Sequence, residues 1–117
     1  MSKQFYSNIC YKISKNYLIM ENFESIINSN QLTLVDFFAT WCGPCKSQSA
    51  ILPELKNEVG EMVKILKIDV DKNSNLAALY GVRSVPTLII FKAGKVLWRE
   101  SGVHDVVTLR NIIENLK

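Results

Sequence analysis

Residues 33–70 pass from a strand pattern through a helix pattern to a second strand pattern. Residues 33–39 are apolar almost throughout, which suits a strand buried on both faces of a sheet. Residues 44–59 carry apolar side chains at helical spacing, and Gly60 favours a helix end there. Residues 62–70 are again rich in β-branched and bulky apolar side chains. This order predicts a parallel βαβ unit with a right-handed crossover.

The C-terminal half predicts a different arrangement. A short helix is expected over residues 74–80. Residues 87–92 and 95–101 have strand patterns, and the glycine between them favours a tight hairpin turn. An apolar stripe after Asp105 predicts a final helix capped by that residue. Together these elements predict an α/β fold. A βαβ unit and a C-terminal ββα unit would form a central mixed sheet with helices on both faces.

The N-terminal residues differ from the rest in charge and pattern. Residues 1–19 hold three lysines and no acid, and they show no clear periodicity. We expect a flexible basic extension over residues 1–19 and one domain over residues 20–117, which begins with a helix. The sequence leaves open whether Met20 is the true start. It also leaves open whether Cys10 is a bystander thiol or a regulatory or dimerising one.

Composition excludes several classes of function. The chain has 117 residues, 48% of them hydrophobic, which is enough for the core of one domain. Its net charge of +3 equals the three lysines of residues 1–19, so the rest is balanced and has no basic cluster for nucleic acid. The longest apolar run, residues 76–80, is far shorter than the roughly 20 residues of a membrane span. We therefore expect neither nucleic-acid nor membrane binding.

The pair Cys42 and Cys45 lies where the first core strand meets its helix. Cysteines three residues apart on a first helical turn are close enough for a disulfide. Cys42 would lie at the helix N-terminus, where free N–H groups and the dipole stabilise a thiolate, while Cys45 would be more buried and protonated. Pro44 suits the first helical turn, and Gly43 leaves Cys42 unshielded. The spacing predicts an attacking sulfur and a resolving sulfur.

Two other interpretations of these cysteines are weaker. A structural disulfide between them would close a loop worth about 2 kcal/mol, against about 4 for a loop from Cys10 to Cys42. A zinc site needs about four ligands, and the chain offers only Cys10 and His104 besides the pair. We therefore expect no metal, and an ordinary loop position for His104.

Asp36, Lys67 and Pro86 are further candidates. Asp36 interrupts an apolar strand, so burial should raise its pKa, and it is either a structural acid or a proton acceptor for Cys45. Lys67 either pairs with Asp36 or extends to solvent. Pro86 precedes a strand, and spacing alone does not decide whether the bond from Val85 is cis.

Several segments carry a family resemblance. Val35-Asp-Phe-Phe-Ala-Thr-Trp-Cys-Gly-Pro-Cys-Lys46 resembles the active-site segment of the thioredoxin family, and residues 81–88 look like its substrate-facing loop. Residues 91–94 and Gly102 also match. The resemblance covers about residues 20–117 and implies a thioredoxin fold, with a four-stranded sheet, an added N-terminal part and flanking helices.

The resemblance also implies roles for individual residues. Asp36 and Lys67 fall where the family has a buried Asp–Lys pair. The Val85–Pro86 bond would be cis, with Pro86 facing the disulfide and the Val85 backbone pairing with substrate. The implied substrate-binding surface consists of Trp41, Gly43, Pro44, Val85, Pro86 and Gly102.

Some positions depart from the family pattern. Phe38 stands where the family often has Trp. Ala50 stands where the family commonly has a Pro that kinks the helix, and Pro53 follows, so we expect the kink about one turn later. Ser47 and Gln48 replace residues that are usually small or apolar, which affects partner preference rather than disulfide chemistry.

These observations predict a cytoplasmic, monomeric thiol–disulfide oxidoreductase that reduces protein disulfides through a reversible Cys42–Cys45 couple. Its partners would be oxidised protein substrates and a thioredoxin reductase as electron donor, with no metal or organic cofactor. An oxidant or isomerase, and a binding module whose thiols are idle, are the alternatives left open.

Overall fold

The computed structural model describes residues 22–117. The extension expected over residues 1–19, with Cys10, and the start of the first helix at Met20 lie outside this range. Residues 22–27 are helical. The elements that follow are β1 (Leu32–Phe38), α3 (Gly43–Val59), the 3₁₀ turn η1 (Gly60–Met62), β2 (Val63–Asp69), α4 (Ser74–Leu79), β3 (Thr87–Lys92), β4 (Lys95–Ser101) and α5 (Val106–Leu116).

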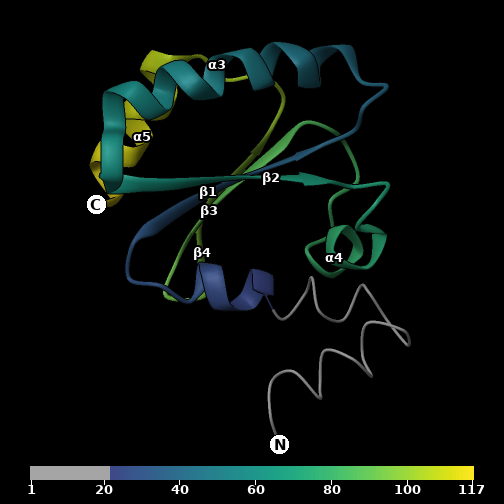
Figure 1. Cartoon of the computed structure of the whole chain (residues 1–117), viewed down its shortest axis with the longest axis horizontal. Coiled ribbons are helices and arrows are strands. Elements are labelled where there is room, and N and C mark those ends of the chain that lie inside the picture. Colours follow the sequence, from purple (N-terminus) through teal and green to yellow (C-terminus); the bar gives the residue numbers. More distant parts are fainter. Residues whose placement is uncertain (1–21) are drawn as a thin grey trace, which may run out of the picture.

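The four strands form one mixed sheet in the order β2-β1-β3-β4. β1 is parallel to β2 and antiparallel to β3, and β3 and β4 form an antiparallel hairpin. Figure 1 shows α3 and α5 on one face of the sheet, and α4 with the helical residues 22–27 on the other. The predicted α/β fold, with its βαβ unit and its C-terminal ββα unit, is confirmed.

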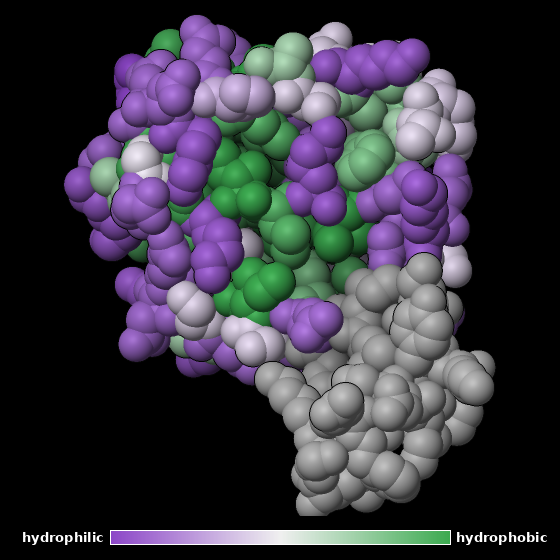
Figure 2. All heavy atoms as spheres, viewed as in Figure 1, coloured by the Kyte–Doolittle hydropathy of each residue, from purple (hydrophilic) through white to green (hydrophobic). Residues whose placement is uncertain are grey.

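Each face of the sheet has its own apolar core. Leu34 of β1 and Leu55 of α3 lie in the core between the sheet and the α3/α5 layer. Phe37 of β1 and Phe23 of the helical residues 22–27 lie in the core on the opposite face. Alternate β1 residues face opposite sides of the sheet, so both sides of this central strand are covered. Figure 2 shows one face of the molecule, where hydrophobic residues gather across the middle between hydrophilic ones.

The ends of the elements follow the expected local chemistry. Gly60 caps α3 with a φ of 57°, a conformation that glycine adopts at little cost. The hairpin turn has positive φ at Ala93 (52°) as well as Gly94 (78°), as a two-residue turn of this hand requires. Asp105 accepts a hydrogen bond from the Thr108 N–H at 2.8 Å, which confirms it as the cap of α5.

α3 continues through Pro53, whose ring nitrogen has no hydrogen to donate to the carbonyl of Ser49. No helix in the described part of the chain is long and apolar enough to cross a bilayer.

Candidate active site

Strand pairing brings four chain segments to one end of the sheet. β1 ends there, and β2, which is parallel to it, ends beside it with Asp69 opposite Phe38. β3 is antiparallel to β1 and therefore begins there, with Thr87 opposite Phe37. β4 ends opposite that beginning, with Ser101 paired to Thr87. The loop before β3 reaches the first turn of α3, where the Val85 carbonyl oxygen lies near the Cys42 sulfur, and Asp71, after β2, accepts a hydrogen bond from Trp41.

Cys42 and Cys45 form a disulfide at this first turn. Cys42 is the N-cap of α3 and Cys45 lies on its first turn, with the two Cα atoms 5.3 Å apart. The Cys45 N–H donates to the Cys42 sulfur at 3.1 Å. Both residues are buried, at 5% and 2% exposure. After reduction, the same N–H and the helix dipole would stabilise a thiolate on Cys42.

The loop before β3 contacts the disulfide from the side. The Val85–Pro86 bond is cis, as the resemblance implies. The Val85 carbonyl oxygen lies 3.6 Å from the Cys42 sulfur. The Gly102 N–H donates to the Pro86 carbonyl at 2.9 Å, so the turn after β4 supports this loop. The loop therefore presents a peptide carbonyl next to the reactive sulfur.

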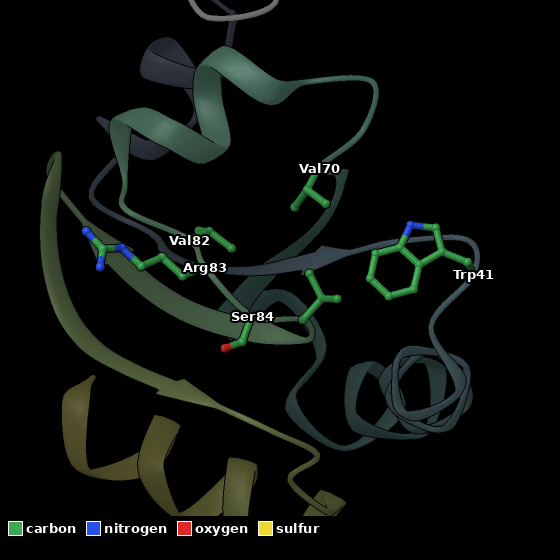
Figure 3. A pocket seen from close by; sticks show the side chains of 6 residues that line it. Trp41, Val70, Val82, Arg83 and Ser84 are labelled. Atoms are coloured by element: carbon green, nitrogen blue, oxygen red, sulfur yellow. The ribbon is translucent and has the colours of Figure 1, made fainter.

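An apolar groove opens beside Cys42. Trp41 is 72% exposed, and its indole N–H donates to Asp71 at 2.9 Å. Figure 3 shows Trp41 on one side of the groove and Arg83 on the other, with Val70 and Val82 between them. The groove has a volume of about 260 Å³. Its apolar walls and the neighbouring backbone groups can receive an extended peptide.

Asp36 lies under the site without a partner. It is fully buried, on the same face of β1 as Leu34, and neither of its carboxyl oxygens has a hydrogen-bond partner among the described residues. Burial raises the pKa of Asp36 from 3.8 to about 6, although the positive charge of Lys67 opposes this rise. The predicted burial and the direction of its effect are confirmed. At neutral pH this carboxyl is mostly ionised and still basic enough to accept a proton.

Lys67 is placed beside Asp36 by strand register, but its ammonium points elsewhere. The two residues are paired positions of β1 and β2. The Lys67 ammonium donates to the Ser49 hydroxyl of α3 and lies 4.6 Å from the centre of the Phe38 ring. The residue is exposed. Lys67 thus contributes its charge to the site, while its hydrogen bond goes to a hydroxyl.

Sequence reasoning missed the structural role of Gln48. Its side chain is fully buried; it donates to the His104 carbonyl at 3.1 Å and accepts from the His104 N–H at 2.8 Å. Gln48 therefore ties α3 to the loop before α5. The helical spacing of Gln48 could have predicted its burial, because residues 45, 48, 52, 55 and 59 form the buried stripe of the helix. His104 lies in the expected loop, where Gln48 fixes its backbone.

The described residues include no group of three or more His, Cys, Asp or Glu side chains that could hold a metal ion. A disulfide at a helix start, a carbonyl beside it and an acid beneath it are suited to thiol–disulfide exchange.

Comparison with known proteins agrees with this geometry. The family model described as Thioredoxin matches residues 14–115. The thioredoxin of Bacillus subtilis strain 168 is 44% identical over 85 residues, which cover 73% of this chain and 82% of that protein. The thioredoxin of Chlamydia pneumoniae is 50% identical over 93 residues, which cover 80% and 89%.

The fold is also that of solved thioredoxins. The X-ray structure of Fasciola hepatica thioredoxin matches with a TM-score of 0.76 and 38% identity, over 84% of this chain and 94% of that one. The chain therefore belongs to the thioredoxin family and is a thiol–disulfide oxidoreductase.

Proposed function

We propose that this protein reduces disulfides of other proteins, with Cys42 as the attacking thiolate and Cys45 as the resolving thiol. The observation that carries this proposal is the N-cap position of Cys42, where its sulfur accepts the Cys45 N–H at 3.1 Å. This position favours the ionised sulfur. Both cysteines belong to the domain that we assign to residues 20–117, with residues 1–19 as an extension.

The reaction proceeds in two exchanges. The Cys42 thiolate attacks one sulfur of a substrate disulfide, a mixed disulfide forms, and the other substrate sulfur leaves as a thiolate that takes up a proton. Cys45 then gives its proton to Asp36 and attacks the Cys42 sulfur, which releases the second substrate sulfur. Two electrons have passed to the substrate, and the Cys42–Cys45 disulfide has formed.

Asp36 is the proton acceptor for the second exchange. Its pKa of about 6 leaves the carboxyl ionised at neutral pH, and this pKa is near enough to neutral pH for the carboxylate to accept a proton efficiently. Lys67 is its charged neighbour on β2 and adjusts its basicity. A carboxyl without other hydrogen bonds has its full acceptor capacity available for the thiol, directly or through a water molecule.

The substrate binds across the exposed surface around the disulfide. The Trp41 ring and the groove beside it receive apolar side chains. The Val85 backbone pairs with the extended substrate chain next to the cysteine under attack, because its carbonyl oxygen lies 3.6 Å from the Cys42 sulfur. Gly43, Pro44, Pro86 and Gly102 complete this docking surface.

The family implies protein substrates and typically a thioredoxin reductase. We propose such a reductase as the electron donor that regenerates the dithiol. We also propose that this protein is monomeric and cytoplasmic. The redox potential of the Cys42–Cys45 couple separates this reductase role from that of an oxidant or isomerase. A strongly oxidising potential would contradict the proposal.

The direct test is reduction of insulin by dithiothreitol with catalytic amounts of this protein. We expect acceleration by the wild type and none by Cys42→Ser. Cys45→Ser should accumulate a mixed disulfide with its substrate, because the resolving thiol is gone. An unchanged rate in Cys42→Ser, or partner complexes that survive loss of both thiols, would contradict the proposed role.

A further inference from the structure

Lys67 and Ser49 lie between two cavities. One cavity, of about 190 Å³, is lined by Cys45, Ser49 and Lys67 together with residues around the end of β1. The other, of about 310 Å³, is lined by Ser49, Lys67 and neighbouring residues of α3 and β2, among them Pro53. Tight packing on both sides therefore does not fix the ammonium. The ammonium donates its hydrogen bond to the Ser49 hydroxyl, and it also lies over the Phe38 ring, 4.6 Å from the ring centre.

The helix geometry explains why Ser49 is in reach. Ser49 follows Cys45 by four residues on α3, so the two side chains share one face of the helix, one turn apart. β2 places Lys67 under this face, beside Asp36 of β1. The Lys67 side chain can therefore turn toward the hydroxyl above it or toward the carboxyl next to it. In the structure it takes the hydroxyl, and both oxygens of Asp36 stay without a hydrogen-bond partner within residues 22–117.

Among the described residues, Lys67 is the charge that acts on Asp36, although Lys46 of α3, an exposed residue, lines the same cavity as Cys45 and Lys67. β3 pairs Leu88 with it. The buried residues of α3 nearest the site are Cys45, held in the disulfide, and the neutral Gln48, while α5 contributes apolar side chains to this core. Burial is the larger influence on the pKa of Asp36, and the position of the Lys67 ammonium is the influence that a side-chain movement can change.

We propose that Ser49 is a positioning residue, whose hydroxyl holds the Lys67 ammonium beside Cys45 and away from the Asp36 carboxyl. This keeps Asp36 unpaired, so that it can take the proton of the resolving thiol. The inference rests on the proposed role of Asp36 as proton acceptor. Without the hydroxyl, the ammonium turns to the carboxyl, pairs with it and makes it a weaker base.

The experiment follows the titration of Asp36 by ¹³C NMR of its carboxyl carbon, in the oxidised protein, where neither active-site thiol titrates. Ser49→Ala should lower the midpoint by about one pH unit, the effect of bringing a unit charge a few ångströms closer at an effective dielectric constant of about 20. Ser49→Thr, which keeps a hydroxyl, should restore the wild-type midpoint. Ser47→Ala, an exposed serine on the same helix, is the matched control and should not move it.

A double variant isolates the ammonium. In a Lys67→Gln background, Ser49→Ala should leave the Asp36 midpoint unchanged. An equal midpoint in wild type and Ser49→Ala, or a shift that persists in the Lys67→Gln background, would overturn the inference.

Kinetics of Asp36→Asn keep this inference separate from the proposed function. If Asp36→Asn does not slow release of the mixed disulfide, the proton-acceptor role fails whatever Ser49 does. If Asp36→Asn slows release while Ser49→Ala leaves the titration unchanged, the role of Asp36 stands and the role of Ser49 fails. When both effects are present, Ser49→Ala should also move the acid limb of the pH–rate profile for mixed-disulfide release to lower pH, by the same amount as the Asp36 midpoint.

Discussion

Asp36 should destabilise the folded protein at neutral pH, and the size of this effect follows from its burial. Its pKa is 3.8 as an ordinary carboxyl and about 6 in the folded chain. Below the lower value, Asp36 is protonated in both the folded and the unfolded chain. Between the two values, the folded chain binds a proton that the unfolded chain has released, so stability falls as pH rises. Above the higher value, the full difference applies, at about 1.4 kcal/mol per pH unit, or about 3 kcal/mol.

Replacement of Asp36 by Asn removes this titration and keeps the shape of the side chain. Relative to the wild type, Asp36→Asn should therefore gain about 2.4 kcal/mol in free energy of unfolding between about pH 4 and pH 7.5. The buried amide adds a constant offset, so the pH dependence of the difference, and not its value at one pH, is the test.

The assay is urea denaturation of the oxidised proteins, followed by far-UV circular dichroism across this pH range. Glu54→Gln, which removes an exposed carboxylate from α3, is the matched control and should give a curve nearly parallel to the wild type. Parallel curves for the wild type and Asp36→Asn would refute the reasoning, because they would mean that the carboxyl titrates alike in the folded and unfolded chain.

Three further predictions concern packing, capping and binding. Gln48→Leu leaves the His104 N–H and carbonyl without their buried partner and should lower the free energy of unfolding by about 1–3 kcal/mol in urea denaturation. Asp105→Ala removes the cap of α5 and should lower the melting temperature. Hydrogen bonds with Thr108 lower the pKa of Asp105. The difference in melting temperature from the wild type should therefore persist at neutral pH and fade as the pH falls through that lowered pKa. Trp41→Ala should raise KM for insulin while leaving the reduction of a small disulfide nearly unchanged, measured by steady-state kinetics, since its ring is exposed at the groove. A similar loss with both substrates would mean that Trp41 acts on the disulfide itself.

The sequence predicts those parts of the structure that depend on local chemistry. The apolar pattern of residues 33–39, the stop at Gly60 and the cap at Asp105 each reflect interactions within a few residues, and the structure places the elements within about a residue of the predicted ends. The disulfide is local too, because both cysteines lie on one helical turn.

Features that depend on side-chain direction were not predictable in this way. Strand alternation puts Lys67 on the same face as Asp36, but it does not say which acceptor a long side chain selects. The choice depends on Ser49, which lies 18 positions away in sequence and comes close only once α3 packs on the sheet. The bond from Gln48 to the backbone of His104 spans 56 positions and has the same origin.

Leaving Asp36 unpaired lowers the stability of the fold but favours proton transfer from the resolving thiol. A full ion pair with Lys67 would offset part of the desolvation of the carboxyl and would therefore stabilise the fold. It would also make the carboxyl a weaker base and occupy the oxygens that the resolving thiol needs. With the ammonium held by Ser49, the charge of Lys67 still lowers the pKa of Asp36, while neither carboxyl oxygen has a hydrogen-bond partner in the described part of the chain. The carboxyl has to be ionised at neutral pH, basic enough to take a proton and unpaired. These three conditions hold together when the positive neighbour lies close to the carboxyl but donates its hydrogen bond to another group.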